Sequence, residues 1–98
     1  MTRYFTITGT NYRLGTDFLE KGMKVRLEKD PENEYDTEAI KVTMPGLKTI
    51  GMVANSVRTV LGECYSAGRL YDKIGDEAEG EVMYVLNGSV VCSIELPD

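Results

Sequence analysis

Short stretches that alternate between apolar and polar residues place the strongest constraint on the fold of this chain. In residues 23–28, Met23, Val25 and Leu27 alternate with charged residues, as in a strand with one buried face. Asn87-Gly88 is typical of a two-residue turn between two antiparallel strands. Similar alternation predicts further strands at residues 4–9, 39–44, 48–53, 77–86 and 89–96. The sequence therefore predicts about six short strands, with a long-looped hairpin joining residues 23–28 to 39–44.

Helical signals are few. Asn55-Ser56 offers a helix cap, and Val57, Val60, Leu61 and Cys64 follow it at helical spacing, which predicts one main helix ending near residues 67–68. Residues 16–22 predict a short helical turn, and residues 69–75 an irregular return. Because no β-α-β alternation is present, we expect a mostly β (α+β) fold. The expected architecture is a small OB-like antiparallel barrel with one main helix and a short helical turn, forming a single domain over residues 1–98.

Composition excludes several classes of function. The 98 residues contain no histidine, which removes the usual imidazole base and the commonest zinc ligand, so we expect no enzyme, no metal site and no cofactor. The net charge of −5 argues against nonspecific attraction to phosphate backbones. No signal peptide or apolar span is visible, so we expect no membrane association. Cys64 and Cys92 both fall in apolar phase and are expected in the core. Because this disfavours a disulfide framework, we expect a cytoplasmic location.

The loop at residues 29–42 is unusually dense in turn-forming residues. Asp30-Pro31 sets a turn, and Asn33 and Asp36 are both able to hydrogen-bond back to the local backbone. Tyr35 lies between those two polar side chains, an arrangement that suits stacking on a base beside polar contacts to the nucleotide. An acidic, solvated hairpin loop is the alternative reading. A calcium loop is disfavoured because Tyr35 occupies the position that needs glycine.

Two further tyrosines are candidates for base stacking. Tyr12 follows the first predicted strand, next to Arg13 and between two glycines of an irregular connection. Tyr84 lies on a predicted strand, where it suits a stacking platform and the core equally well.

Four segments of the chain together resemble a known family. They are Thr8-Gly9-Thr10-Asn11-Tyr12, residues 22–27, residues 30–42 with Asn33, Tyr35-Asp36 and Ala39-Ile40, and Ile50-Gly51-Met52-Val53. In this combination the chain resembles a HIRAN domain, a module found at the front of fork-remodelling DNA translocases and as small free-standing bacterial and phage proteins. The likeness covers residues 5–53 well and the last hairpin by pattern.

The resemblance implies an OB-like barrel that captures the 3′ end of single-stranded DNA. It implies that Tyr12 and Tyr35 stack on terminal bases, that Asn33 hydrogen-bonds the nucleotide, and that Asp36 accepts from the terminal 3′-hydroxyl. Tyr84 matches an aromatic position on the penultimate strand. A carboxylate at the position of Asp36 tolerates a hydroxyl donor and repels a phosphate, which makes it a filter for the type of end.

The chain departs from the family where DNA-binding eukaryotic members carry phosphate-facing groups. Asn11 replaces a basic residue, and Met52 and Asn55 replace a histidine and a lysine. Each lost cationic contact weakens backbone binding. Arg13, Lys48 and Arg58 are candidates to compensate.

We therefore expect a non-enzymatic module that recognises single-stranded DNA 3′-hydroxyl ends in DNA repair or replication-fork processing, beside a helicase or nuclease in trans. The alternative is a protein-interaction module that keeps the barrel and uses its acidic loops to meet a basic partner. A small hydrolase is disfavoured by the missing histidine. Convergence of Arg3, Arg13, Lys24, Arg26 and Lys48 beside Tyr12 and Tyr35 would favour DNA.

Overall fold

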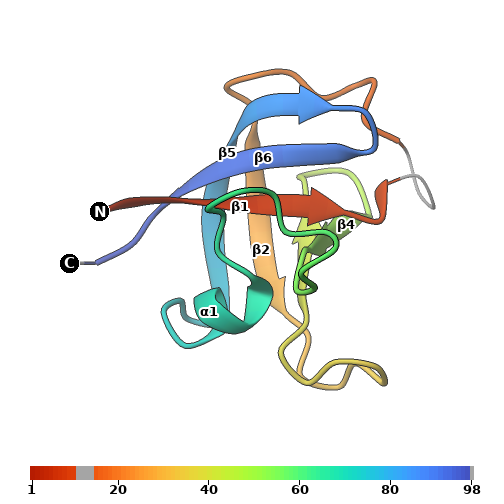
Figure 1. Ribbon diagram of the computed structural model, residues 1–98. Coiled ribbons are helices and arrows are strands. Elements are labelled where there is room, and N and C mark those ends of the chain that lie inside the picture. Colours follow the sequence, from red (N-terminus) through yellow and green to blue (C-terminus); the bar gives the residue numbers. More distant parts are fainter. Residues whose placement is uncertain (11–14, 98) are drawn as a thin grey trace.

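Strands form a closed antiparallel barrel in the computed structural model, which describes residues 1–10 and 15–97 (Figure 1). Around the barrel the order is β1-β4-β3-β2-β5-β6, and each strand pairs antiparallel with both neighbours. The strands are β1 (Thr2–Thr8), β2 (Lys24–Lys29), β3 (Ile40–Thr43), β4 (Thr49–Val53), β5 (Glu77–Leu86) and β6 (Ser89–Glu95). The predicted fold class is confirmed, and the strands lie where alternation predicted them, apart from small differences at their ends.

The core fills the barrel with the apolar side chains of each alternation. Phe5, Leu27, Ile50 and Val82 are among the fully buried residues, and burying a large apolar side chain of this kind contributes about 1.5–3 kcal/mol. Cys92 is also fully buried, as predicted. The prediction for Cys64 was wrong: this residue is only half-buried, because the segment that carries it is not helical.

Two glycines allow the sheet to turn and close. Gly88 adopts a φ of 83° in the β5–β6 hairpin, a conformation that side chains rarely tolerate. A Cβ atom at Gly51 would lie 2.5 Å from Cγ2 of Ile7 and 2.8 Å from the carbonyl oxygen of Thr8. Only glycine therefore allows the backbone of β4 to approach β1 this closely, at the end of β1 where two residue pairs join these strands.

The predicted helix at residues 56–67 was wrong. This segment instead crosses the outside of β1, where the Leu61 N–H donates to Oγ1 of Thr6 at 3.2 Å and the Tyr65 N–H donates to the Tyr4 carbonyl at 2.7 Å. Val57 is 97% exposed, so the apolar spacing does not describe a buried helical face. Hydrogen bonds to an otherwise open strand edge compete with those of a helix, and here they prevail.

The α-helix α1 (Ala67–Tyr71) begins where that segment leaves β1, at a residue predicted to end a helix. Oγ of Ser66 caps it by accepting from the Arg69 N–H, and Leu70 packs in the core. The residues from 69 to 71 were predicted as irregular and are helical.

Residues 16–22 form turns rather than the predicted helical turn. The Leu19 N–H donates to the Thr16 carbonyl at 3.0 Å, and the Met23 N–H donates to the Glu20 carbonyl at 3.1 Å. Leu19 is buried between these two turns, so its side chain ties the connection to the core instead of continuing a helix.

Candidate nucleic-acid interface

The loop between β2 and β3 is shaped by Asn33. Its Oδ1 accepts from the backbone N–H groups of Tyr35 at 2.9 Å and Asp36 at 3.1 Å, and its Nδ2 donates to Oδ2 of Asp30 at 3.3 Å. Oδ1 of Asp36 accepts from the Glu38 N–H at 2.9 Å. The prediction that Asn33 and Asp36 bond back to the local backbone is confirmed, and the loop is held in one shape from within.

Asp36 is also held from outside its own loop. Its Oδ2 accepts from Nδ2 of Asn55 at 2.7 Å, and Oδ1 of Asn55 in turn accepts from the Gly68 N–H at 2.8 Å. One amide side chain therefore connects the loop to the start of α1. Each carboxylate oxygen of Asp36 keeps acceptor capacity beyond the single hydrogen bond described for it.

Tyr35 projects from the loop into open space. Its side chain is 93% exposed, so it does not anchor the loop on the core. Asn33 fixes the backbone of Tyr35, while the ring itself is open to solvent. An open ring on the residue directly before a positioned carboxylate suits stacking on an unpaired base.

The other predicted stacking residues lie elsewhere or outside the described residues. Tyr84 is 59% exposed, which excludes the core reading. Its strand β5 pairs with β2 from Glu77 to Glu81, so Tyr84 lies past the start of β2, whereas the Tyr35 loop follows the end of β2. These two rings are therefore at opposite ends of the β2–β5 ladder. Asn11, Tyr12 and Arg13 fall outside the described residues.

The ends of the segment that contains Tyr12 are nevertheless placed. The Gly15 N–H donates to the Thr10 carbonyl at 2.9 Å, and Oγ1 of Thr10 lies 3.4 Å from the Gly88 carbonyl. Thr10 therefore lies beside the β5–β6 hairpin, at the end of the barrel that carries Tyr84, and Gly15 is held next to Thr10.

Lys41 is a cation that lies between the Tyr35 loop and the end of β1. Its neighbours Ile40 and Val42 are fully buried, so Lys41 lies on the outer face of β3. Met52 pairs with Lys41 on one side and with Thr8 on the other, so the three side chains form a row across β3, β4 and β1. Lys41 was not among the predicted site residues, although its place in the alternation marks it as outward-facing.

Several predicted basic residues are paired instead of gathered at one face. Nζ of Lys24 lies 2.6 Å from Oε1 of Glu81, which raises the pKa of Lys24 mainly through that hydrogen bond, and Arg26 lies 3.4 Å from Glu77. Lys48 follows β3 at the end opposite the Tyr35 loop. The described residues therefore give no convergence of these three cations beside Tyr35.

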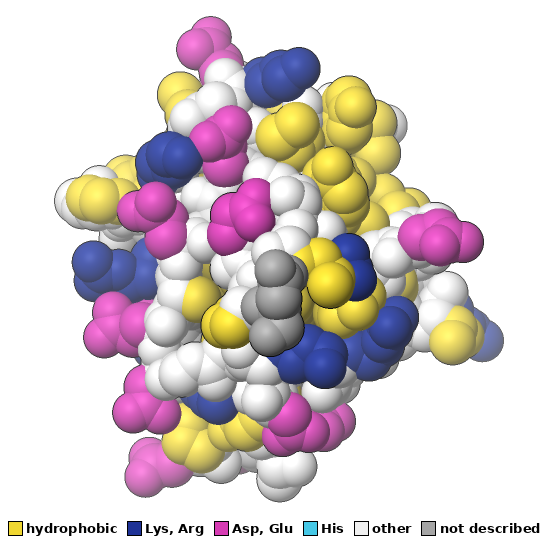
Figure 2. All heavy atoms as spheres, turned by 90° about the vertical axis from the view of Figure 1, so that its left-hand side faces the viewer, with side chains coloured by type: hydrophobic (Ala, Val, Ile, Leu, Met, Phe, Trp, Pro, Cys, Tyr) yellow, Lys and Arg dark blue, Asp and Glu magenta, His cyan; other side chains and the backbone are white. Residues whose placement is uncertain are grey.

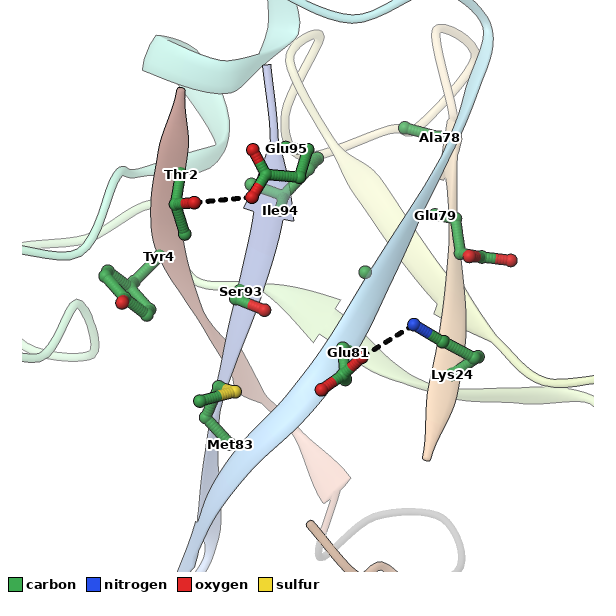
Figure 3. Close-up of a pocket in the computed structure, with 11 residues that line it drawn as sticks. Thr2, Tyr4, Lys24, Ala78, Glu79, Glu81, Met83, Ser93, Ile94 and Glu95 are labelled. Atoms are coloured by element: carbon green, nitrogen blue, oxygen red, sulfur yellow. Dashed lines mark hydrogen bonds and ion pairs between the residues drawn. The ribbon is translucent and has the colours of Figure 1, made fainter. Parts of the chain in front are cut away.

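A wide cavity of about 660 Å³ lies on the outer face of β1, β6, β5 and β2 (Figure 3). Tyr4 and Met83 line this cavity together with Glu79, Glu81 and Glu95. The carboxylate of Glu95 accepts a hydrogen bond from the Thr2 hydroxyl. Because this surface carries three carboxylates and a lysine that is already paired, it repels phosphate. It is a poor surface for a nucleic-acid backbone.

Two negative findings concern residues 1–10 and 15–97. No group of three or more His, Cys, Asp or Glu side chains in these ranges is arranged to hold a metal ion. Within the same ranges, no helix is long and apolar enough to cross a membrane.

Comparisons with known proteins agree on one family. The family model of the HIRAN domain matches residues 2–95. A solved structure, the HIRAN domain of human HLTF, superposes with a TM-score of 0.70 over 97% of this chain and 74% of that chain, at 20% sequence identity. At that identity the structural likeness shows a shared fold. No curated protein matches the chain in sequence.

Proposed function

The chain belongs to the HIRAN domain family, and from this premise we propose that it is a non-enzymatic DNA-binding module for single-stranded 3′-hydroxyl ends. Family membership supports the nucleic-acid-binding part of this proposal. The end specificity rests on Asp36, whose carboxylate is positioned by the Glu38 N–H and by Asn55. We infer that the DNA 3′ end is the partner in repair or replication-fork processing, with a helicase or nuclease acting in trans.

The observation that carries the proposal is the open ring of Tyr35 beside the fixed carboxylate of Asp36. A base stacked on an aromatic ring contributes about 1–3 kcal/mol with little dependence on sequence. A terminal hydroxyl donates to a carboxylate, whereas a terminal phosphate places negative charges next to it. Stacking therefore supplies affinity, and Asp36 supplies selection for the type of end.

In this proposal Tyr12 and Tyr84 complete the surface at the end of the barrel away from the Tyr35 loop. What supports this is the position of Thr10 and Gly15, the described residues on either side of residues 11–14: Thr10 lies beside Gly88 of the β5–β6 hairpin, near the strand that carries Tyr84, and Gly15 is hydrogen-bonded to Thr10. The row of Lys41, Met52 and Thr8 lies across the strands between this region and the Tyr35 loop. In this proposal Lys41 supplies a phosphate contact where Asn11, Met52 and Asn55 carry no charge, and Arg13 adds a second.

Fluorescence anisotropy at low salt tests the proposal with three labelled probes: a single strand with a 3′-hydroxyl, the same strand with a 3′-phosphate, and a blunt duplex. The first is expected to bind best. Asp36→Ala is expected to narrow the margin between the first two, because it removes both the acceptor and the repulsive charge. Equal weak binding of all three probes would leave only generic electrostatic attraction and contradict the proposal.

The rival function is a protein-interaction module, and the acidic cavity beside Tyr4 is the observation that favours it. A basic partner would complement Glu79, Glu81 and Glu95 there. Glu79→Lys separates the two functions, since it is expected to leave binding of the 3′-hydroxyl strand unchanged. Loss of binding to a basic partner in this variant, with no DNA binding in the parent protein, would favour the rival.

A further inference from the structure

Arg3, Arg69 and Lys73 gather around Tyr65. The side of the barrel where both chain ends lie carries a group of Lys and Arg side chains (Figures 1 and 2). The guanidinium carbon of Arg69 lies 3.8 Å from the centre of the Tyr65 ring, and Nε of Arg3 donates to the Tyr65 hydroxyl at 3.0 Å. Lys73 lines the same cavity of about 310 Å³ as Arg3 and Tyr65. We call Arg3, Tyr65, Arg69 and Lys73 the basic cleft.

The cations of the basic cleft have no acidic partners among residues 1–10 and 15–97. The ion pairs recorded there join Lys24, Arg26 and the amino terminus to glutamates, and none of them involves Arg3, Arg69 or Lys73. Arg3 uses part of its guanidinium on Tyr65 and on the Thr2 carbonyl at 3.0 Å. Because neighbouring like charges repel one another, a cluster of this kind is stabilised by an anion that binds between them.

The charges act together on Tyr65. Its pKa is lowered, first by the hydrogen bond from Arg3 and then by the positive charges of Arg3, Arg69 and Lys73, against the opposing effect of burial. All three cations are therefore close enough to a common point to influence one group there. In a chain with a net charge of −5, such a local concentration of positive charge is a candidate anion site.

The basic cleft is connected to the proposed end site. A second cavity, of about 390 Å³, runs from Asn55 past Val57 and Val60 to Arg69. Asn55 contacts Asp36 at the Tyr35 loop and the Gly68 N–H at the start of α1, next to Arg69. A polymer that touches the Tyr35 loop is therefore able to reach the basic cleft along one surface. The acidic cavity beside Tyr4 offers no such path for a phosphate chain.

We propose that the basic cleft is a second nucleic-acid contact, which binds backbone phosphates whether or not the strand has an end. The choice of nucleic acid over other phosphate carriers rests on the function proposed above. Arginine contributes planar donors that suit phosphate oxygens, and Lys73 adds a mobile charge. The end site then selects the terminus, and the basic cleft adds affinity that depends on salt.

The test compares the double variant Arg69→Glu and Lys73→Glu with the parent protein on a closed circular single strand of about 20 nucleotides, long enough for binding sites of this class. Both residues are exposed, so circular dichroism is expected to show an unchanged fold. We expect affinity for the circle to fall by about tenfold or more at low salt, and the slope of log K against log salt to flatten by about 1.4, which corresponds to two phosphate contacts. Lys21→Glu with Lys24→Glu is the matched control, with the same change in net charge at two other exposed positions, the second of them in the acidic cavity beside Tyr4.

The end site gives an independent readout. The double variant is expected to leave the ratio of 3′-hydroxyl to 3′-phosphate binding unchanged, whereas Asp36→Ala is expected to reduce that ratio and leave binding of the circle unchanged. Lys73→Gln provides a milder second variant, with an expected slope change of about 0.7. An equal loss in the matched control, or an unchanged slope in the double variant, would overturn the proposal. So would a loss of binding to phosphatidylserine vesicles with no loss on DNA.

Discussion

Replacing Gly51 with alanine tests how closely β4 must approach β1. The new methyl group would lie 2.5 Å from Cγ2 of Ile7 and 2.8 Å from the Thr8 carbonyl oxygen. Both neighbours belong to a strand in the closed barrel, and Ile7 is fully buried, so neither is free to swing away. Overpacking of this kind costs about 1–3 kcal/mol. Part of this loss in the free energy of unfolding, roughly 0.5–1 kcal/mol, is offset because alanine in a strand loses less backbone entropy than glycine on folding.

The net effect should be a loss of about 1–2 kcal/mol in the free energy of unfolding. For a domain of this size, that corresponds to a fall in Tm of about 5–15 °C, to be measured by thermal unfolding followed with circular dichroism. Gly75→Ala is the matched control, because a methyl group there would meet nothing within 4 Å. Equal melting temperatures for the two variants would refute the reasoning.

The same substitution should also affect binding. A methyl group at Gly51 would lie 3.2 Å from Cγ2 of Thr10, the last described residue before the Tyr12 segment. Displacing the end of β1 would move Thr10 away from its place beside Gly88. We expect Gly51→Ala to bind the 3′-hydroxyl strand more weakly than Gly75→Ala at a temperature where both are folded. Unchanged binding would show that the position of the β1 end does not matter for the ligand.

Two further predictions concern single side chains. Asn55→Ala should lower the free energy of unfolding by about 1 kcal/mol, because it removes two hydrogen bonds. The same variant should show a smaller preference for 3′-hydroxyl over 3′-phosphate strands in the anisotropy assay. An unchanged preference would show that Asn55 does not position Asp36. Burial raises the pKa of Cys92 from 9.0 to about 12, with a smaller effect from Cys64, so the folded state holds this proton more tightly than the unfolded state. The stability that this bound proton contributes is fully present below about pH 9 and is lost between pH 9 and about 12. From pH 8 to pH 10, the free energy of unfolding measured with urea should therefore fall by about 1 kcal/mol less in Cys92→Val than in the parent protein. An equal fall in both proteins would contradict this.

The strands were predictable because each depends on a local pattern. Period-two alternation in residues 23–28 and the turn at Asn87-Gly88 are signals that neighbouring residues carry by themselves. Closing the barrel then needs only that each alternation turns its apolar face inward. The turn chemistry of Asn33 and Asp36 was predictable for the same reason, since their hydrogen bonds reach only two or three residues along the chain.

The misplaced helix shows where local pattern fails. Val57, Val60, Leu61 and Cys64 have helical spacing, but their segment is captured by Thr6 and Tyr4 on a strand more than fifty residues earlier. Hydrogen bonds between such distant segments leave no trace in the spacing of apolar residues. The helix that does form begins only after the last of these contacts, at Ala67, with Ser66 as its cap.

The same limit applies to the sites. From the sequence, Asn55 is a candidate helix cap at a position where DNA-binding family members carry a lysine. Only the fold places its amide between Asp36 and Gly68. The basic cleft brings Arg3 together with Arg69 and Lys73, residues from opposite ends of the chain. A sequence pattern offers no signal for such a cluster beyond the presence of the charges.

Closure of the sheet has a consequence for any protein that works beside this domain. Residues 54–65 cover the side of β1 that β4 leaves unpaired, with the Ala54 and Tyr65 N–H groups bonded to the carbonyls of Thr6 and Tyr4. β1 therefore offers an incoming peptide no free row of backbone donors and acceptors along which to extend the sheet. Any protein that docks against this strand must therefore recognise side chains and loops, and its docking should be sensitive to surface substitutions and insensitive to the main chain of β1.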